Sequence, residues 1–570
     1  MSPATRLMYT AAVSAPRPRD PLPPSPPGMS TEPAASASHR LGQRLAGLSD
    51  AWLTLLVALV LFVLAAWPLL LVDLPPFQDL PNHVATAHII AHPDLYPQYI
   101  FNGFFKSNSI LTLWLYTFGG LGLYGAARAF TAVVLATGAL ALPLFVLRFA
   151  GRRALVVAML FLWPLVHGFF VSMGMLNFSF AFAFSLILLA VIDGQRARPS
   201  LGRGVGIAVL SVVLWYAHPF PLAMVSCLVG LQVIRRPTWR ARLAASLTLI
   251  FPLLPAVFLT LVAAHQHLSK TESAQAVASS GFSYLNPLEL VGHFWLDASG
   301  ALTWWGAMTI VPAILLPYFG WKHRREDRPI FSNLALTILA AAYFVLPVMV
   351  SNWWYLNCRL VPFLWVGLGL RLPTRLPRKV AGVLATCAVS FSAVMGMDYV
   401  RLDRDRAAFT AGMAAVPERA TLLPLLFKKD KTSDFTSSLT HAWGYYTVER
   451  NTAAPLVFAV ERSYPISYRD FPPAALIPPA FDRFAEDHGT SAHVCKGHGR
   501  APTDADCVAV WRDEWRAFWR EAEPRFSHVL TWAMPPSARP MIPGNYRLVF
   551  SVGELQIFAR DTPASSVSPL

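Results

Sequence analysis

A carboxylate near the start of the chain, Asp79, lies where it could act as a catalytic base. It stands in the stretch PPFQDLPNH, a few residues after the first long apolar run, and His83 follows four residues later. A carboxylate can accept the proton of an attacking hydroxyl, and an imidazole can assist it or bind a divalent cation such as Mg²⁺ or Mn²⁺ with it. The structural alternative is that Asp79 caps a helix beginning near Pro81, and the two roles are compatible.

Four basic side chains are candidates for binding an anion such as a phosphate. Arg359 is predicted at the outer end of a late apolar run, where a charge is costly unless it reaches water or binds a partner. Anchoring at the membrane interface is the alternative for this residue. Lys106, His218 and Lys270 are further candidates for the same anionic pocket.

The composition defines the elements that must position these residues. The chain is 55% hydrophobic and 14% charged, with a mean hydropathy of +0.44, which indicates a polytopic membrane protein. Its net charge of +15 comes largely from arginines in short segments between apolar runs. Because this distribution is typical of cytoplasmic loops, we interpret the charge as a topology signal and not as a nucleic-acid surface.

The apolar runs predict a three-part chain. Residues 1–48 are rich in Pro, Ser and Ala and are expected to form a disordered cytoplasmic tail. Residues 49–397 are expected to form an all-α membrane domain of about 11 transmembrane helices, with exterior loops at 73–109 and 265–300. His218-Pro219 should break the apolar run 204–234 into two helices, and the run 110–148 should contain an additional helix.

The remaining residues, 398–570, predict a soluble exterior α/β domain. Short β-rich runs surround turn signals near the C-terminus, and the segment WRDEWRAFWREAEPRF has the spacing of an amphipathic helix. Cys495 and Cys507 could close a disulfide there if the domain faces an oxidising periplasm. A zinc site is not predicted beside them, because the spacing of the nearby histidines does not match a zinc-binding pattern.

The first exterior loop also carries a family resemblance. PPFQDLPNHVATAHII resembles the first exterior loop of the GT-C superfamily of membrane glycosyltransferases, and more particularly a group of bacterial polytopic proteins with a D-[YL]-P-N-H element. The segments HGFFVSMGMLNFSFAFAF, WYAHPFP and NCRLVPF are similar to that group as well. The resemblance implies a sugar donor linked to a polyprenyl phosphate or pyrophosphate, and an acidic residue in this loop, here Asp79, acting as base or metal ligand.

One departure from the family pattern bears on the chemistry. Many members have paired acidic residues in this loop, whereas Leu80 follows Asp79, so that only Asp73 or Asp94 could supply a second carboxylate. A single displacement with inversion needs only one, because a phosphate is already a leaving group. A divalent cation, Mg²⁺ or Mn²⁺, could bind at Asp79 and His83, and the pattern does not decide whether the reaction needs one.

We therefore predict a GT-C-like glycosyltransferase of the bacterial inner membrane, acting on an envelope acceptor at the outer face. Its N-terminus is expected in the cytoplasm and its C-terminal domain in the periplasm, and its partners would be the bilayer, the lipid-linked sugar and the acceptor. A transporter or flippase, and a non-catalytic protein of the same fold, are the alternatives.

Overall fold

The computed structural model describes residues 47–268, 282–286, 290, 304–322, 330–350, 353–428, 437–455, 459, 464–470, 472–473, 476, 480–497, 499, 501 and 504–561. Asp50–Leu570 form one compact unit, to which the following description applies. The predicted tail 1–48 lies almost wholly outside the described residues, as do Lys270 and most of the predicted loop 265–300.

Within the described residues, six helical segments are long and apolar enough to cross a membrane, so the chain is a multi-pass membrane protein. They are Asp50–Leu70 (α2, Asp50–Ala66, with η1, Trp67–Leu70), α5 (Leu123–Ala150), Arg152–Ser172 (α6, Arg152–Leu162; η4, Trp163–Leu165; α7, Phe169–Ser172), α8 (Leu176–Ala197), Trp239–Ala263 and α18 (Arg378–Thr410). The fifth combines α11 (Trp239–Ala245), a π-turn over Ser246–Ile250, η6 (Phe251–Leu253) and the start of α12 (Leu254–Leu268).

Shorter apolar helices lie between these segments. They are α4 (Ile110–Phe118) with η3 (Gly119–Leu121), α9 (Leu201–Ala217), α10 (Pro219–Ile234), α15 (Trp304–Lys322), α16 (Asn333–Val345) and α17 (Val361–Gly369), the last preceded by η7 (Cys358–Leu360). The additional helix predicted before α5 is confirmed as α4. Length alone does not decide how many of these helices cross, so the count of about 11 stays a prediction.

The break predicted at His218-Pro219 is confirmed. His218 has an extended backbone between α9 and α10, and Pro219 opens α10 at a position where its missing N–H costs no hydrogen bond. The two helices contain 17 and 16 residues, or about 25 Å each at 1.5 Å per residue. A hairpin of this kind brings its two basic ends to the same side, as the arginine pattern requires.

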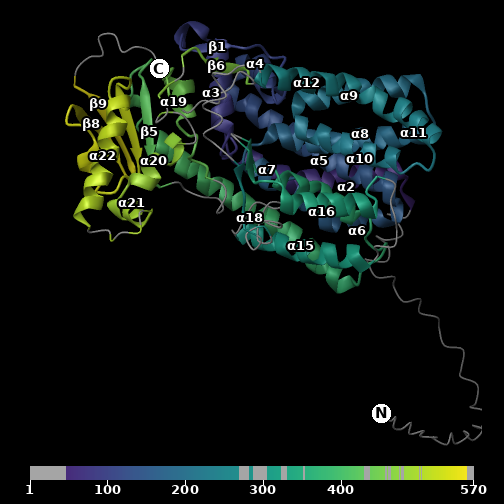
Figure 1. The fold of residues 1–570 in the computed structure, drawn as a ribbon. Coiled ribbons are helices and arrows are strands. Elements are labelled where there is room, and N and C mark those ends of the chain that lie inside the picture. The colour runs from purple at the N-terminus through teal and green to yellow at the C-terminus, as the bar shows by residue number, and fades with distance from the viewer. Residues whose placement is uncertain are drawn as a thin grey trace, which may run out of the picture. The chain divides into compact units, whose positions relative to one another are not determined.

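The C-terminal part of the chain is built around a four-stranded sheet in the order β5-β7-β9-β8. Its strands are β5 (Leu422–Leu426), β7 (His528–Trp532), β8 (Tyr546–Val552) and β9 (Leu555–Arg560), and β5 and β7 are parallel while the other pairs are antiparallel. The amphipathic segment forms α22 (Ala505–Ala522), whose Trp515 and Phe518 are buried. The predicted α/β character of this region is therefore confirmed (Figure 1).

Several short helices and a small sheet lie between these larger elements. They are η2 (Pro93–Leu95), η8 (Met413–Ala415), α19 (Gly444–Arg450), α20 (Ala480–His488), α21 (Ser491–Gly497), η10 (Arg539–Met541) and a small sheet of β2 (Phe282–Ser283), β3 (Met349–Val350) and β4 (Trp353–Trp354).

The first loop, residues 73–109, is part of the same body as the C-terminal sheet. Its helix α3 (Leu80–Ala91) contributes Ala85 and Ile89 to the hydrophobic core that contains Leu423 and Trp443. Its strand β1 (Tyr99–Phe101) pairs with β6 (Ile466–Tyr468) in an antiparallel ladder. Two segments distant in sequence thus fold together, and this is the arrangement that positions Asp79.

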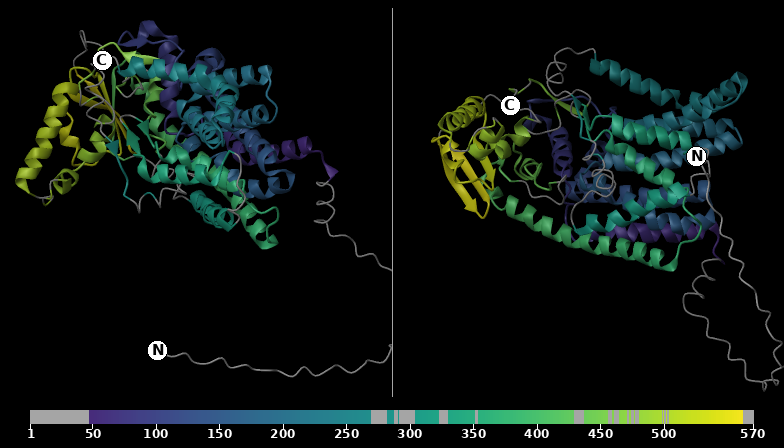
Figure 2. Two further views of the ribbon diagram at one scale, coloured as in Figure 1. Left: turned by 45° about the vertical axis from the view of Figure 1, so that its right-hand side comes forward. Right: turned by 60° about the horizontal axis from the view of Figure 1, so that its bottom comes forward.

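Helix α18 connects the membrane helices to this body without a break. It contains 33 residues and is about 50 Å long. The second view in Figure 2 shows it running from the helix bundle to the sheet. The domain boundary predicted at residue 398 falls inside this helix, because the charged residues that lower the hydropathy there do not interrupt its hydrogen bonding.

Candidate functional site

Asp79 occupies the N-cap position of α3, but its side chain does not perform the capping role considered from the sequence. The structure shows no capping hydrogen bond from this carboxylate, and Pro81 lies at the helix start. The side chain is 14% exposed. The carboxylate is therefore mostly shielded from water.

Backbone contacts fix the position of Asp79. Its N–H donates to the carbonyl of Met173 at 3.0 Å, in the turn between α7 and α8. The next residue, Gly174, has a φ of +84°, and a Cβ there would lie 2.9 Å from the nitrogen of Asp79. Only glycine fits this approach without strain, so the membrane helices place the carboxylate through direct backbone packing.

An aromatic contact anchors the loop two residues earlier. The ring of Phe77 makes edge contacts with His167, at 5.9 Å between centroids, and with Tyr399 of α18, at 6.0 Å. His167 Nε2 and the Tyr399 hydroxyl lie 2.8 Å apart, which joins the two supporting rings. Burial of one aromatic ring of this size contributes about 1.5–3 kcal/mol, enough to hold the loop end in place.

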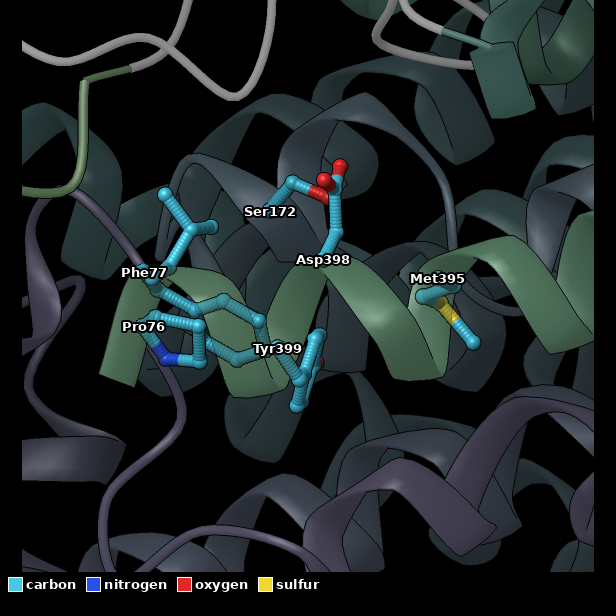
Figure 3. A pocket seen from close by; sticks show the side chains of 7 residues that line it. Pro76, Phe77, Ser172, Met395, Asp398 and Tyr399 are labelled. Atoms are coloured by element: carbon cyan, nitrogen blue, oxygen red, sulfur yellow. The ribbon is translucent and has the colours of Figure 1, made fainter. Parts of the chain in front are cut away.

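A small cavity adjoins this anchor. It has a volume of about 10 Å³ and is lined by Pro76, Phe77, Ser172, Met395, Asp398, Tyr399 and Leu402. Figure 3 shows the side chains of Asp398 and Ser172 directed toward each other at its edge. The cavity is the size of about one water molecule, so it is too small to bind a substrate.

His441, which the sequence analysis did not identify, lies beside Asp79. Its Nε2 is 3.5 Å from Oδ1 of Asp79, and its side chain is 6% exposed. The residue precedes α19 in the stretch SSLTHAWGYY. The fold thus brings together a carboxylate and a buried imidazole that are far apart in the sequence.

Three contacts hold α19 and the residues before it against α3. Gln78 Oε1 accepts a hydrogen bond from the N–H of Ser437 at 2.9 Å, and His88 Nε2 lies 2.8 Å from Oδ1 of Asn451. Between them, a Cβ on Gly444 would lie 2.5 Å from the carbonyl oxygen of Pro81. The close backbone approach at this glycine sets the spacing between the two segments that carry Asp79 and His441.

Arg359 and His218 form a second pair. The guanidinium is buried, its Nη1 lies 3.0 Å from Nε2 of His218, and its Nη2 donates to the carbonyl of Trp354 at 3.2 Å. The same group lies over the ring of Phe178, 5.5 Å from its centroid. Helix α8, the α9–α10 break and η7 therefore meet at one cationic point.

The carboxylate and the cationic pair belong to the same region. The turn between α7 and α8 contacts both: the Met173 carbonyl accepts from the N–H of Asp79 at 3.0 Å, and the Met175 sulfur lies 4.0 Å from Nη2 of Arg359. The charge of Asp79 also favours the protonated form of Arg359. Opposite charges at this range favour one another, and a partly buried setting weakens the screening by water. Asp79, His441, Arg359 and His218 therefore surround one area where the membrane helices meet the C-terminal body.

The other predicted residues are His83, Lys106 and Lys270. The N–H of His83 donates to the carbonyl of Asp79 at 3.2 Å, one turn along α3, and burial lowers the pKa of its ring to about 4, so the imidazole is neutral near pH 7. Its role beside Asp79 stays a prediction. Lys106 is half-buried in a loop attached to α9 through Ser109 N–H and the Tyr216 carbonyl, 3.1 Å apart, and its own N–H donates to the carbonyl of Phe104 at 2.8 Å. Lys270 lies outside the described residues.

The remaining candidates are the carboxylates of the first loop and the two cysteines of the C-terminal region. Asp73 and Asp94 are exposed, and Asp73 lies near Arg406 of α18. Cys495 and Cys507 form a disulfide with a Cα–Cα distance of 5.6 Å, which joins α21 to α22. Across the described part of the chain, no three His, Cys, Asp or Glu side chains cluster as a metal site would require.

Comparisons with known proteins give structural neighbours only. No protein-family model and no curated protein matches the chain. Among solved structures, ArnT from Cupriavidus metallidurans bound to undecaprenyl phosphate matches 90% of this chain and 98% of its own length at 15% identity and a TM-score of 0.48. The apo state of the same protein matches with a TM-score of 0.47 at 12% identity, over 89% of this chain and 97% of its own.

A third solved structure is the arabinofuranosyltransferase AftD from Mycobacteria. It matches 91% of this chain at 13% identity and a TM-score of 0.44, and this chain spans 40% of its length. With all three TM-scores below 0.5, the proposals that follow rest on the residues of this chain.

Proposed function

We propose that this protein is a membrane glycosyltransferase that transfers a sugar from a polyprenyl-phosphate donor to a hydroxyl of an envelope acceptor. The observation that carries the proposal is the carboxylate of Asp79, which lies 3.5 Å from a buried imidazole and interacts electrostatically with a buried guanidinium. A base and a cation on one area are the two groups that such a displacement needs.

The proposed reaction is a single displacement. The acceptor oxygen attacks the anomeric carbon and forms the new C–O bond, while its proton passes to the carboxylate of Asp79. The bond between the anomeric carbon and the phosphate oxygen breaks, and its electron pair stays on the phosphate. The anomeric configuration is inverted, and no second carboxylate is needed.

The Arg359 and His218 pair is suited to receive that leaving phosphate. Nδ1 of His218 accepts a hydrogen bond from the N–H of Phe220 at 3.1 Å. A neutral imidazole has one acceptor nitrogen, so Nε2 then carries the proton and faces a guanidinium that can only donate. Two donors directed at one another are stabilised by an anion that accepts from both, which supports a phosphate at this place.

The surroundings fit a lipid-linked donor. The cationic pair stands among α8, α9, α10 and η7, all flanked by apolar helices, so that a polyprenyl chain could remain in the bilayer while its phosphate reaches Arg359. We propose that this face is the periplasmic face of the bacterial inner membrane, with the N-terminus in the cytoplasm. Where a divalent cation takes part, Asp79 would be its first ligand.

The proposal is tested by mass spectrometry of envelope glycans and polyprenyl-linked sugars in a deletion strain. The strain is complemented with the parent, with Asp79→Asn, or with Asp94→Asn as a matched exposed carboxylate of the same loop. We expect the parent and Asp94→Asn to restore the missing sugar modification, and Asp79→Asn to accumulate in the membrane without restoring it. Full restoration by Asp79→Asn would refute the proposal, as would a deletion that changes no glycan.

A further inference from the structure

The contact between Asp79 and His441 joins two parts of the chain that no local sequence pattern connects. His441 belongs to the segment 437–451, which is held against α3 by the Gln78–Ser437 hydrogen bond, the Gly444–Pro81 approach and the His88–Asn451 contact. Its ring is held from behind by a perpendicular contact with the buried Trp443, 6.4 Å between centroids. The imidazole therefore has a defined position on the carboxylate.

We propose that His441 is a positioning residue of the catalytic centre, and that the C-terminal body thereby completes a site that the membrane helices build only in part. Nε2 of His441 lies 3.5 Å from Oδ1 of Asp79, so a proton on Nε2 would be donated to the carboxylate and hold it in the orientation that accepts the proton of the acceptor hydroxyl. The distance of 3.5 Å is long for a hydrogen bond, and such contacts shorten when substrate is bound. This inference rests on the proposed function.

The geometry identifies which ring nitrogen matters. Glutamine carries its amide nitrogen near the position of Nε2, whereas asparagine carries it near that of Nδ1. Both amides are polar and smaller than or similar to imidazole, so a role that is only structural would tolerate them about equally. A role that depends on Nε2 facing Asp79 would be kept by His441→Gln and lost by His441→Asn.

The experiment compares these two variants in the deletion strain, with the envelope sugar measured per molecule of protein in the membrane. We expect His441→Gln to stay within about threefold of the parent and His441→Asn to fall by about 10- to 100-fold, the loss expected when a reacting group is displaced by about 1 Å.

A second histidine, partly buried, supplies the control. His488 Nε2 lies 3.1 Å from Glu514, and its Nδ1 lies 2.9 Å from the carbonyl of Phe484, so it is also paired with a carboxylate in the C-terminal body. His488→Gln and His488→Asn are expected to leave the sugar yield per molecule unchanged.

The outcomes separate this inference from the proposed function. If Asp79→Asn is inactive while His441→Asn matches the parent, or while the Gln and Asn variants lose activity equally, His441 does not position the base and the transferase proposal stands. If Asp79→Asn is fully active, the transferase proposal fails first, and the role of His441 fails with it.

Discussion

Replacing Gly444 by alanine tests whether the spacing between α3 and α19 controls the geometry of the site. The new Cβ would lie 2.5 Å from the carbonyl oxygen of Pro81 and 2.9 Å from its carbonyl carbon. Carbon and carbonyl oxygen normally approach to about 3.3 Å, so the two segments must separate by about 0.8 Å. The obstacle is backbone on the α3 side, so a side-chain rotation cannot relieve it.

The displacement would reach His441 directly. The N–H of Gly444 bonds to the carbonyl of His441 at 3.0 Å, so the two residues move as one turn. The distance from Nε2 to Oδ1 of Asp79 would lengthen from 3.5 Å to about 4.3 Å, beyond hydrogen-bonding range. We expect a fall in transfer of about 10- to 100-fold and a loss of about 1–3 kcal/mol of stability from overpacking.

The assay measures sugar transfer per molecule in the complemented strain, together with the thermal midpoint of the purified protein in detergent. Gly382→Ala is the matched control, because a Cβ at that position of α18 meets nothing within 4 Å. In a helix interior it should leave transfer unchanged and leave the midpoint equal or raised. A Gly444→Ala variant with the parent's transfer and midpoint would show that the α3–α19 spacing does not control the site.

Three further changes have defined outcomes. Because the pKa of His83 is lowered from 6.5 to about 4, the unfolded chain binds a proton that the folded one does not between these values, so stability should fall as pH drops through this window. His83→Gln should therefore lose less of its thermal midpoint between pH 7 and pH 5 than the parent, and an equal loss would contradict the burial argument. Arg359→Ala should weaken binding of the proposed polyprenyl phosphate, measured by native mass spectrometry, by about 10-fold or more, the value of a charge-assisted hydrogen bond. Arg371→Gln, at the opposite end of α17 and bonded to the carbonyl of Phe331, should keep the parent's affinity; equal weakening by both changes would remove Arg359 from the phosphate site. Cys507→Ser opens a link across a sequence separation of 12 residues and should cost about 3 kcal/mol in the chain-entropy view, seen as a lower midpoint. Alkylation of Cys495 and Cys507 in the parent, measured on peptides by mass spectrometry, should require a reductant, whereas Cys227 is free to react without one.

Much of the architecture could be predicted from local sequence patterns. Pro219 in a long apolar run indicates the break between α9 and α10, and tryptophan and phenylalanine at helical spacing indicate α22. These signals work because they depend on residues within one or two turns of each other. The number of membrane crossings could not be predicted in this way. Several apolar helices are shorter than a bilayer needs, so their length does not show whether they cross.

Only some residues of the candidate site could be predicted from the sequence. Asp79 could be identified from its place before Pro81, and Arg359 from the cost of a charge in an apolar run. His441 lies 362 residues after Asp79 in the sequence. A histidine in a turn carries no information about a partner at that separation. Gly174 and Gly444 are required by close backbone approaches, which exist only once the tertiary structure has formed.

The pairing of β1 with β6 has a consequence for how the protein is made. Phe101 and Ile466 are ladder partners separated by 365 residues. At a translation rate of 5–20 residues per second, roughly 20–70 s pass between the synthesis of β1 and that of its partner strand β6. During that interval Ile89 and Tyr99, which end in the shared core, have no apolar surface of the later segments to cover them. The part of the loop around β1 must therefore stay uncovered or be protected until translation is nearly complete, and a chain truncated before residue 466 would lack the partner strand of β1.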